Sequence, residues 1–323
     1  MKSLAVLATL SLVTFALLMQ GPPIGVFGRK FYGGPAAKAG TAALEKQTTI
    51  IAEPVTVPAT ELNGLTPAGA WVLTADNKWF GGLSGLLIEG DRMIAASDRA
   101  HLLRADLSVE QGQLETSDAT LWHLRDAADR LLDGKEGDAE SLARSDGHLL
   151  ISFERDHRIE RLDASGLLQP WMRPPGFADL SNNGGIEALA SLRDGRVLAI
   201  AEDPVDDLTL WWLLDQDNVI DQGTLALAPP HRVTGSTIDP EGRLYLVLRD
   251  FSVARGVSIR IQRLTLEQGR PSVSTLETLA AFENLSGIDN MEGIAISDGF
   301  LWIIADNNFN PGQRTLLLRF KLD

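Results

Sequence analysis

Two sets of acidic residues recur along this chain at positions where they could act together. The first set opens short apolar runs: Glu140, Glu187 and Glu292. The second set lies at the end of the second apolar run of each hairpin: Asp98, Glu154, Glu202, Asp250 and Asp306. Carboxylates that return at the same structural position predict a site where several oxygen atoms meet.

The clearest example of this pairing is residues 289–308. Glu292 and Asp306 are 14 residues apart, and the turn-forming sequence Ser297-Asp298-Gly299 lies midway between them. Two apolar runs joined by such a turn predict a β-hairpin, which returns the chain to its starting end. We therefore expect both carboxylates at one end of the same hairpin.

The hairpin unit is repeated five times, which predicts the fold class. Equivalent positions fall at residues 84, 140, 187, 236 and 292, so the spacings are 56, 47, 49 and 56 residues. Periods of this length with several strands per unit are typical of β-propeller blades. We expect an all-β propeller in which the innermost strand of each blade presents its first residues to the central axis.

The two ends of the chain are expected to close the ring together. After residue 315 the last blade has a third strand but no fourth, and the strand-like residues 48–57 can supply it. Shared closure removes the exposed sheet edges of an open array. Because residues 70–74 also favour a strand, six blades are predicted, with five as the alternative. Helical periodicity is confined to residues 120–133 and 177–181.

Converging carboxylates repel one another unless a cation or a proton lies between them. The chain has no cysteine and five histidines, and oxygen ligands of this kind suit Ca²⁺, or alternatively Mg²⁺. The expected metal ligands are Glu140, Glu187, Glu292, Asp98, Glu154 and Glu202. The expected catalytic carboxylates are Glu292, Asp306, Glu140 and Glu187. Ordinary turn and strand-end chemistry is the alternative explanation for any one of them.

Basic side chains lie next to these acids in the sequence. The residues expected to bind an anionic substrate are Arg99, Arg155, Arg249 and His157. Acids, arginines and a histidine at one rim suit a phosphoester held beside a metal ion. The alternative is that each arginine pairs with its neighbour on a solvated loop.

Charge and missing motifs narrow the class of function. A formal net charge of −14 argues against a nucleic-acid partner, which requires a basic face. The chain has no Walker A run, H-E-x-x-H or G-x-S-x-G sequence. We expect a monomer that acts on a small anionic or ester substrate.

The N-terminal 40 residues have a different character. Residues 4–19 are apolar and follow Lys2, which is typical of an export signal, although an uncleaved membrane anchor is also compatible with them. Residues 21–40 are rich in Gly and Pro and predict a flexible linker. We expect a signal peptide or membrane anchor at residues 1–20, a linker at 21–40 and the propeller domain at 41–323. The protein is expected to be periplasmic or secreted, and an uncleaved N-terminal segment would anchor it to the inner membrane.

Several segments resemble the phytase-like domain family, also described as having esterase-like activity of phytase. They are Phe80–Leu86, Ala96–Arg99, Asp138–Leu142, Ser152–Glu154, Asn183–Leu189, Asp289–Ile294, Asp306–Asn308 and Gln313–Leu316. The resemblance covers about residues 60–323 and implies an exported bacterial propeller that hydrolyses phosphoesters or esters. The first and fourth repeats depart from an all-acidic pattern, because Ser84 and Gly235-Ser236 stand where the others have an acid.

Three functions remain open from the sequence. The first is metal-assisted hydrolysis of phosphoester or ester substrates at the mouth of the propeller. The second is a propeller that binds a ligand or protein without catalysis, and the third is a calcium-dependent lactonase.

Overall fold

The computed structural model describes residues 45–323 except 58, 60, 217, 284–287 and 289. The predicted signal or anchor at 1–20 and the predicted linker at 21–40 lie outside the described residues. In the described part of the chain, no helix is long and apolar enough to cross a bilayer.

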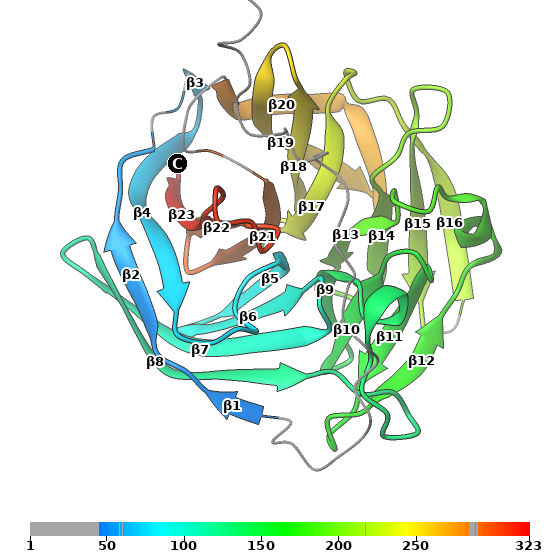
Figure 1. Ribbon diagram of the computed structural model, residues 1–323. Coiled ribbons are helices and arrows are strands. Elements are labelled where there is room, and N and C mark those ends of the chain that lie inside the picture. The colour runs from blue at the N-terminus through cyan, green and yellow to red at the C-terminus, as the bar shows by residue number, and fades with distance from the viewer. Residues whose placement is uncertain (1–44, 58, 60, 217, 284–287, 289) are drawn as a thin grey trace, which may run out of the picture. The chain divides into compact units, whose positions relative to one another are not determined.

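Five antiparallel sheets make up the domain, and each forms one blade of a propeller (Figure 1). The first blade contains β5 (Leu83–Glu89), β6 (Arg92–Ser97), β7 (His101–Glu110), β8 (Gln113–His123) and β1 (Glu45–Gln47). The second contains β9 (Ala139–Ser145), β10 (His148–Phe153), β11 (Arg158–Leu162) and β12 (Leu168–Met172). The third contains β13 (Ile186–Ser191), β14 (Val197–Ala201), β15 (Thr209–Asp215) and β16 (Asn218–Leu225).

The remaining two blades each take in strands from the N-terminal part of the chain. The fourth contains β17 (Arg232–Ile238), β18 (Arg243–Ser252), β19 (Gly256–Glu267), β20 (Arg270–Glu283) and β3 (Glu61–Leu62). The fifth contains β21 (Met291–Ser297), β22 (Phe300–Ala305), β23 (Thr315–Leu322), β4 (Leu65–Ala75) and β2 (Ile50–Pro54).

The innermost strands form a closed ring around the axis. Each of them contacts the next in the order β5, β9, β13, β17, β21 and back to β5. The predicted all-β propeller is confirmed, and the number of blades is five, which was the alternative to six. The sixth blade is absent from the described residues because β4 and β2 are used as the outer strands of the fifth blade.

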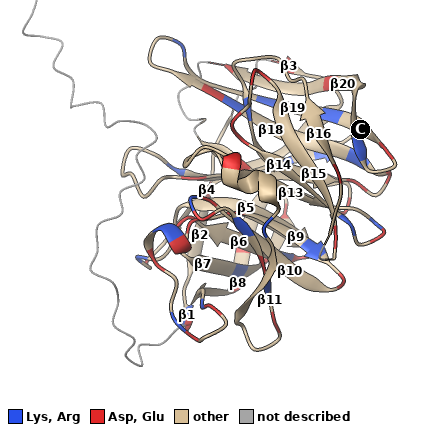
Figure 2. Ribbon diagram, turned by 90° about the vertical axis from the view of Figure 1, so that its right-hand side faces the viewer, with Lys and Arg blue, Asp and Glu red and all other residues tan. Residues whose placement is uncertain are grey.

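Strands from both ends of the chain complete the fifth blade, as the sequence predicts, but the fourth strand is β4 and not the expected residues 48–57. The last strand, β23, pairs antiparallel with β4, and the register brings Leu322 opposite Leu65 and Thr315 opposite Leu73. β2 then pairs with the outer side of β4. Charged residues occur at many of the turns and strand ends (Figure 2).

The predicted helical segment at 120–133 is wrong. Residues 120–123 end β8, and residues 124–133 form turns and an isolated bridge between Arg125 and Leu131. Two of the apolar residues that give this segment its apparent helical period, Leu124 and Leu132, are buried between the strands of the first and second blades. The segment at 177–181 overlaps a short 3₁₀ helix, Pro175–Asp179.

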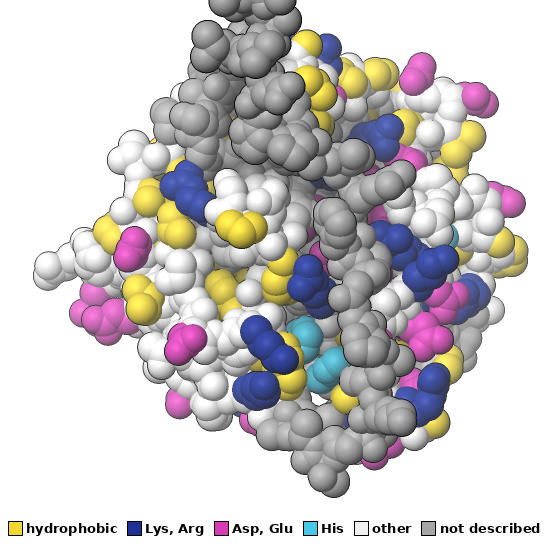
Figure 3. All heavy atoms as spheres, in the orientation of Figure 1, with side chains coloured by type: hydrophobic (Ala, Val, Ile, Leu, Met, Phe, Trp, Pro, Cys, Tyr) yellow, Lys and Arg dark blue, Asp and Glu magenta, His cyan; other side chains and the backbone are white. Residues whose placement is uncertain are grey.

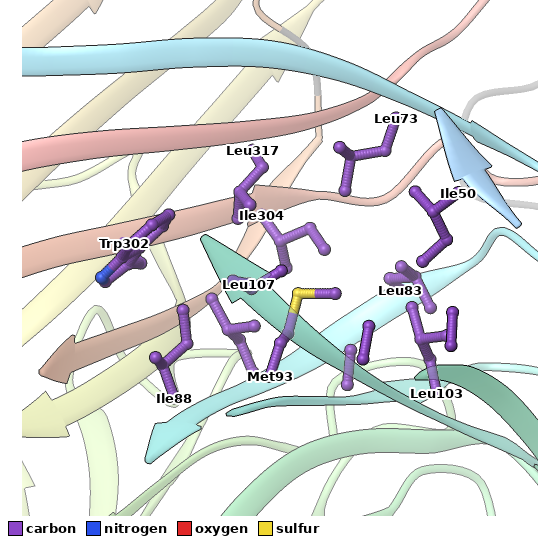
Figure 4. Close-up of a cluster of buried hydrophobic side chains, with 14 of the residues drawn as sticks. Ile50, Leu73, Leu83, Ile88, Met93, Leu103, Leu107, Trp302, Ile304 and Leu317 are labelled. Atoms are coloured by element: carbon purple, nitrogen blue, oxygen red, sulfur yellow. The ribbon is translucent and has the colours of Figure 1, made fainter. Parts of the chain in front are cut away.

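A large apolar cluster fills the interface where the first blade meets the fifth. Trp302 and Ile304 of β22 and Leu317 of β23 pack against Leu83 and Met93 (Figure 4). The ring systems of Trp71 and Trp302 stack with centroids 6.4 Å apart. Apolar burial at this junction holds the two ends of the ring together.

Replacing Ile304 by Ala is expected to destabilise the protein. Ile304 is fully buried, and removing its outer carbons leaves a cavity at the closure of the ring, with a cost of about 2–5 kcal/mol in the free energy of unfolding. Ile51→Ala is the matched control, because Ile51 belongs to the same sheet but is 57% exposed; its cost should be within about 0.5 kcal/mol. Denaturant unfolding measures both, and equal costs would contradict a core at this junction.

Candidate functional site

The same irregularity occurs in the innermost strand of every blade. Near its start, each inner strand contains one residue that has no opposite partner in the second strand, which is a β-bulge. The five bulged residues are Ser84, Glu140, Glu187, Thr234 and Glu292. All five are at least 94% buried. A bulge re-aims a side chain, so the fivefold repeat places five polar groups equivalently around the axis.

Residues at equivalent positions toward the end of each second strand, or directly after it, form a second ring. In four blades the residue is an acid whose backbone N–H donates to the carbonyl of the inner strand's leading segment: Asp98, Glu154, Glu202 and Asp306. In the fourth blade the equivalent residue is Arg249, which lies opposite Arg232 in the β17–β18 register. One basic residue therefore interrupts a ring of carboxylates.

Two groups of acids at this end of the blades are close enough to share a cation. The carboxylates of Asp138, Glu140 and Glu154 offer oxygen atoms within 4.8 Å of one another, and so do those of Glu154, Glu187 and Glu202. Glu154 belongs to both groups and joins the second blade to the third. The structure thus brings together four of the predicted metal ligands and adds Asp138.

The other predicted carboxylates lie in a different environment. Glu292 and Asp306 both accept hydrogen bonds from the side-chain amide of Asn290, at 2.7 and 3.2 Å. Asp98 lies beside Gly82, because a Cβ added to Gly82 would be 2.1 Å from the Oδ1 atom of Asp98. Among the described residues, the two acidic groups include neither Glu292 nor Asp98.

Two predicted substrate-binding arginines contact these acids. Arg155 Nε donates to Asp138 Oδ2 at 2.6 Å and is 3.8 Å from a carboxylate oxygen of Glu154. Arg249 donates to Asn290 and, at 3.3 Å, to Glu202. Burial disfavours the Arg249 cation, but the charges of Glu202, Glu292 and Glu187 outweigh it and raise the pKa of Arg249. Arg249 therefore remains a cation among acids from the third and fifth blades.

Arg99, the third predicted arginine, is exposed at the rim. Its guanidinium lies over the ring of Phe309, 3.6 Å from the centroid. Asn307 holds this corner together, because its Oδ1 accepts from the backbone N–H groups of Gly82 and Phe309. Phe309 is not predicted by the repeat, since it belongs to the connection between β22 and β23 rather than to a blade strand.

His157 is a buried residue in the turn between β10 and β11. Its Nε2 lies 2.9 Å from the backbone carbonyl oxygen of Ser181. A carbonyl oxygen only accepts, so Nε2 carries the proton of the neutral ring. Burial lowers the pKa of His157 below its usual value.

The eight carboxylates of this region are buried: Asp98, Asp138, Glu140, Glu154, Glu187, Glu202, Glu292 and Asp306. The guanidinium groups of Arg155 and Arg249 lie against them. Burial and mutual repulsion both disfavour the charged form of a carboxylate, and a bound cation or proton relieves both effects. The donor set therefore fits a divalent cation that prefers oxygen ligands.

The repeat predicted from the sequence is displaced in the fourth blade. It places Ser236 in the first ring and Asp250 in the second, whereas the registers place Thr234 and Arg249 there. Asp250 instead accepts from Arg255 at 2.9 Å.

Lys, Arg and His side chains gather near the middle of the face drawn in Figure 3, and Asp and Glu are more frequent toward its rim. The described residues include a pair of histidines, His101 at the start of β7 and His123 at the end of β8, with ring centroids 4.7 Å apart. Trp79 stacks on His101 at 4.7 Å, and Lys46 lies over Trp79. The sequence does not predict this cluster, because its members come from three separated segments.

The family model Phytase-like, described as esterase-like activity of phytase, matches residues 78–309. No curated protein matches the chain.

Solved structures resemble the domain only distantly. A glucose dehydrogenase from Thermus thermophilus, described as a putative oxidoreductase, is 14% identical, with a TM-score of 0.41 over 84% of this chain and 99% of that one. A gluconolactonase from Xanthomonas campestris is 13% identical, with a TM-score of 0.40 over 89% and 99%.

Replacing Gly235 by Ala is expected to disrupt the ring of inner strands. A Cβ at this position would lie 1.9 Å from the backbone oxygen of Glu292, so β17 and β21 would have to separate. We expect a loss of about 1–3 kcal/mol or more in the free energy of unfolding. Gly312→Ala is the control, since its nearest contact would be 3.4 Å away. Equal stability of the two variants in denaturant would contradict this close approach.

His101 is expected to make stability depend on pH. Burial, and then the neighbouring His123, lower the pKa of His101 to about 3, against 6.5 for an ordinary histidine. Between these values the unfolded chain binds the proton more readily, so stability falls as pH falls below 6.5. From pH 7 to 4.5 the loss attributable to His101 is about 2.5 kcal/mol.

The comparison is between the wild type and His101→Phe, which keeps an aromatic ring against Trp79. The variant should lose less stability over this pH range, and the exposed His148→Gln should behave like the wild type. Parallel stability–pH curves for the wild type and His101→Phe would refute the assignment.

Proposed function

Because this chain belongs to the phytase-like family, described as esterase-like activity of phytase, we propose that it is a metal-assisted hydrolase of phosphoester or carboxylic ester substrates. The observation that carries the proposal is the pair of buried acidic groups that share Glu154. Either group would hold a cation through three acids: Asp138, Glu140 and Glu154 in one, and Glu154, Glu187 and Glu202 in the other. A divalent cation bound there would polarise the phosphoryl or carbonyl oxygen of the substrate.

Arginines beside the acidic groups would orient an anionic substrate. Arg249 interrupts the second ring of carboxylates, so its guanidinium would bind a negatively charged oxygen of the substrate at that position. Arg155 holds Asp138 in place and lies next to Glu154. A guanidinium binds phosphate or carboxylate oxygens through paired N–H donors, which favours anionic over neutral substrates.

We assign Glu292 as the group that accepts a proton from the attacking water. Asn290 orients its carboxylate at 2.7 Å, and the Arg249 charge acts on it from the fourth blade. The water oxygen forms a bond to phosphorus or to the acyl carbon, and the bond to the alcohol oxygen breaks. The proton passes to Glu292 and then to the departing alcohol oxygen, so the products are an alcohol and an acid.

The test is hydrolysis of p-nitrophenyl phosphate and p-nitrophenyl acetate by chelator-treated protein, with and without added Ca²⁺, Mg²⁺, Mn²⁺ or Zn²⁺. We expect activity to depend on the added cation. Glu154→Gln should lower kcat/KM by about 100-fold, since it removes the oxygen donor common to both groups.

The matched control is Glu241→Gln in the turn between β17 and β18, at the opposite end of the blade, where the side chain is 64% exposed. It should retain wild-type kcat/KM. Full activity in chelator would sink the proposal. Cation binding without turnover of either substrate would instead support the non-catalytic propeller.

A further inference from the structure

Three basic side chains at the first blade have no acidic partner. Lys46, Lys78 and Arg99 form no ion pair with any residue that the structure describes, although the whole chain carries a formal net charge of −14. By contrast, the guanidinium groups that lie against the two acidic groups are both paired. Lys78 and Arg99 are also exposed. Their positive charge is therefore not neutralised within the described part of the chain.

The three cations lie around His101, at the start of β7. Lys46 Nζ is 4.1 Å from the ring centroid of Trp79, which stacks on His101 at 4.7 Å. Lys78 directly precedes Trp79 in the chain, and Arg99 precedes His101 by two residues. Burial is the main cause that lowers the pKa of His101 to about 3, and the charges of all three cations contribute. We call Lys46, Lys78, Arg99 and His101 the basic cluster.

The centre of the basic cluster also contains a hydrogen-bond donor that is not satisfied. Both ring nitrogens of His101 are buried and have no hydrogen-bond partner in the part of the chain that the structure describes. The ring is neutral at pH 7, so one of these nitrogens carries a hydrogen. An N–H group without an acceptor and cations without a carboxylate have the same requirement, which is a negatively charged oxygen.

The basic cluster begins next to the second ring of the site. Arg99 directly follows Asp98 of that ring, and its guanidinium lies over Phe309, 3.6 Å from the ring centroid. Phe309 and Asp98 are neighbours, because a Cβ added to Gly82 would be 2.5 Å from one and 2.1 Å from the other. A guanidinium stacked on an aromatic ring keeps its N–H groups at the edge of its plane. Arg99 can therefore bind a carboxylate or phosphate group beside the ring.

We propose that the basic cluster is an oxyanion-binding site, which takes a carboxylate or phosphate group of a small molecule, and that it favours esters that carry such a group in addition to the bond that is cleaved. The oxyanion site itself is independent of hydrolysis, whereas the preference for such esters rests on the proposed function. Unlike Arg155 and Arg249, the basic cluster has no carboxylate that the ligand must displace.

The direct test is NMR of the indole N–H groups of the seven tryptophans during titration of chelator-treated protein with inorganic phosphate. The chelator removes any divalent cation that could bind phosphate at the acidic groups. The resonance that is missing in Trp79→Phe should shift, because Trp79 contacts both Lys46 and His101. Sodium chloride at equal ionic strength is the reference. A Trp79 resonance that moves no further with phosphate than with chloride overturns the proposal.

Calorimetry provides the second readout. In the double variant Lys46→Gln/Lys78→Gln, affinity for phosphate should fall by about tenfold or more, since each ammonium supplies a charge-assisted hydrogen bond. Lys321→Gln is the matched control, because Lys321 lies opposite Phe300 at the other end of the fifth blade, and it should bind phosphate as the wild type does. Equal phosphate affinity in the wild type and a folded double variant would refute the site.

Vesicles of phosphatidylcholine and phosphatidylglycerol distinguish a small anion from the headgroups of a membrane. Exposed lysines and arginines can also bind an anionic lipid surface. We expect the protein to remain in the supernatant when the vesicles are sedimented. Sedimentation of the wild type but not of the double variant, without a response to free phosphate, would overturn the assignment of a small-molecule ligand.

Hydrolysis tests the preference among esters. The double variant should have a raised KM for mono-p-nitrophenyl succinate, which carries a carboxylate, and an unchanged KM for the neutral p-nitrophenyl acetate. Equal changes for the two esters contradict the preference. If phosphate shifts the Trp79 resonance but neither ester is hydrolysed, only the proposed function fails.

Discussion

Close approach of five inner strands around one axis is the constraint on which the rest of this structure depends. Directly after the bulge, each inner strand has a residue with a small side chain or none: Gly85, Ser141, Ala188, Gly235 and Gly293. At Gly235 and Gly293, a Cβ would lie within 3.0 Å of the backbone of the neighbouring blade. Side-chain hydroxyls fasten other joints, since Thr234 donates to the carbonyl of Met291 and Ser152 to that of Ile186.

The same close approach concentrates charge. A bulge followed by a small residue brings acids from adjacent blades within reach of one another, and burial then makes their ionisation costly. Charged and polar groups are therefore distributed unevenly among the five blades. The second and third blades hold the two acidic groups, and Arg249 of the fourth blade reaches one of their members, Glu202. In the fifth blade, Asn290 donates to both Glu292 and Asp306.

The sequence predicts the architecture better than the site, for physical reasons. Strand alternation and turn residues are local, so the hairpins and the return of Glu292 and Asp306 to one end follow from short stretches. The number of blades does not follow from short stretches, because it depends on whether residues 65–75 begin a blade or complete one. Their pairing with β23 shows that they complete one. The same limit applies to Arg249, whose place in the ring depends on a register shift of the kind that turns cannot reveal. The contact of Phe309 with Arg99 joins segments more than 200 residues apart and has no local signal.

The pairing of β23 with β4 has a consequence for the order in which the molecule can be assembled. Leu65 meets Leu322 across almost the whole length of the domain, so the fifth blade cannot be completed until the last strand has been synthesised. Long-range pairings of this kind slow folding, although the entropy of closing a long loop rises only slowly with its length. A nascent or truncated chain that lacks β23 thus carries the acids of the second and third blades without a complete fifth blade, the blade from which Glu292 comes.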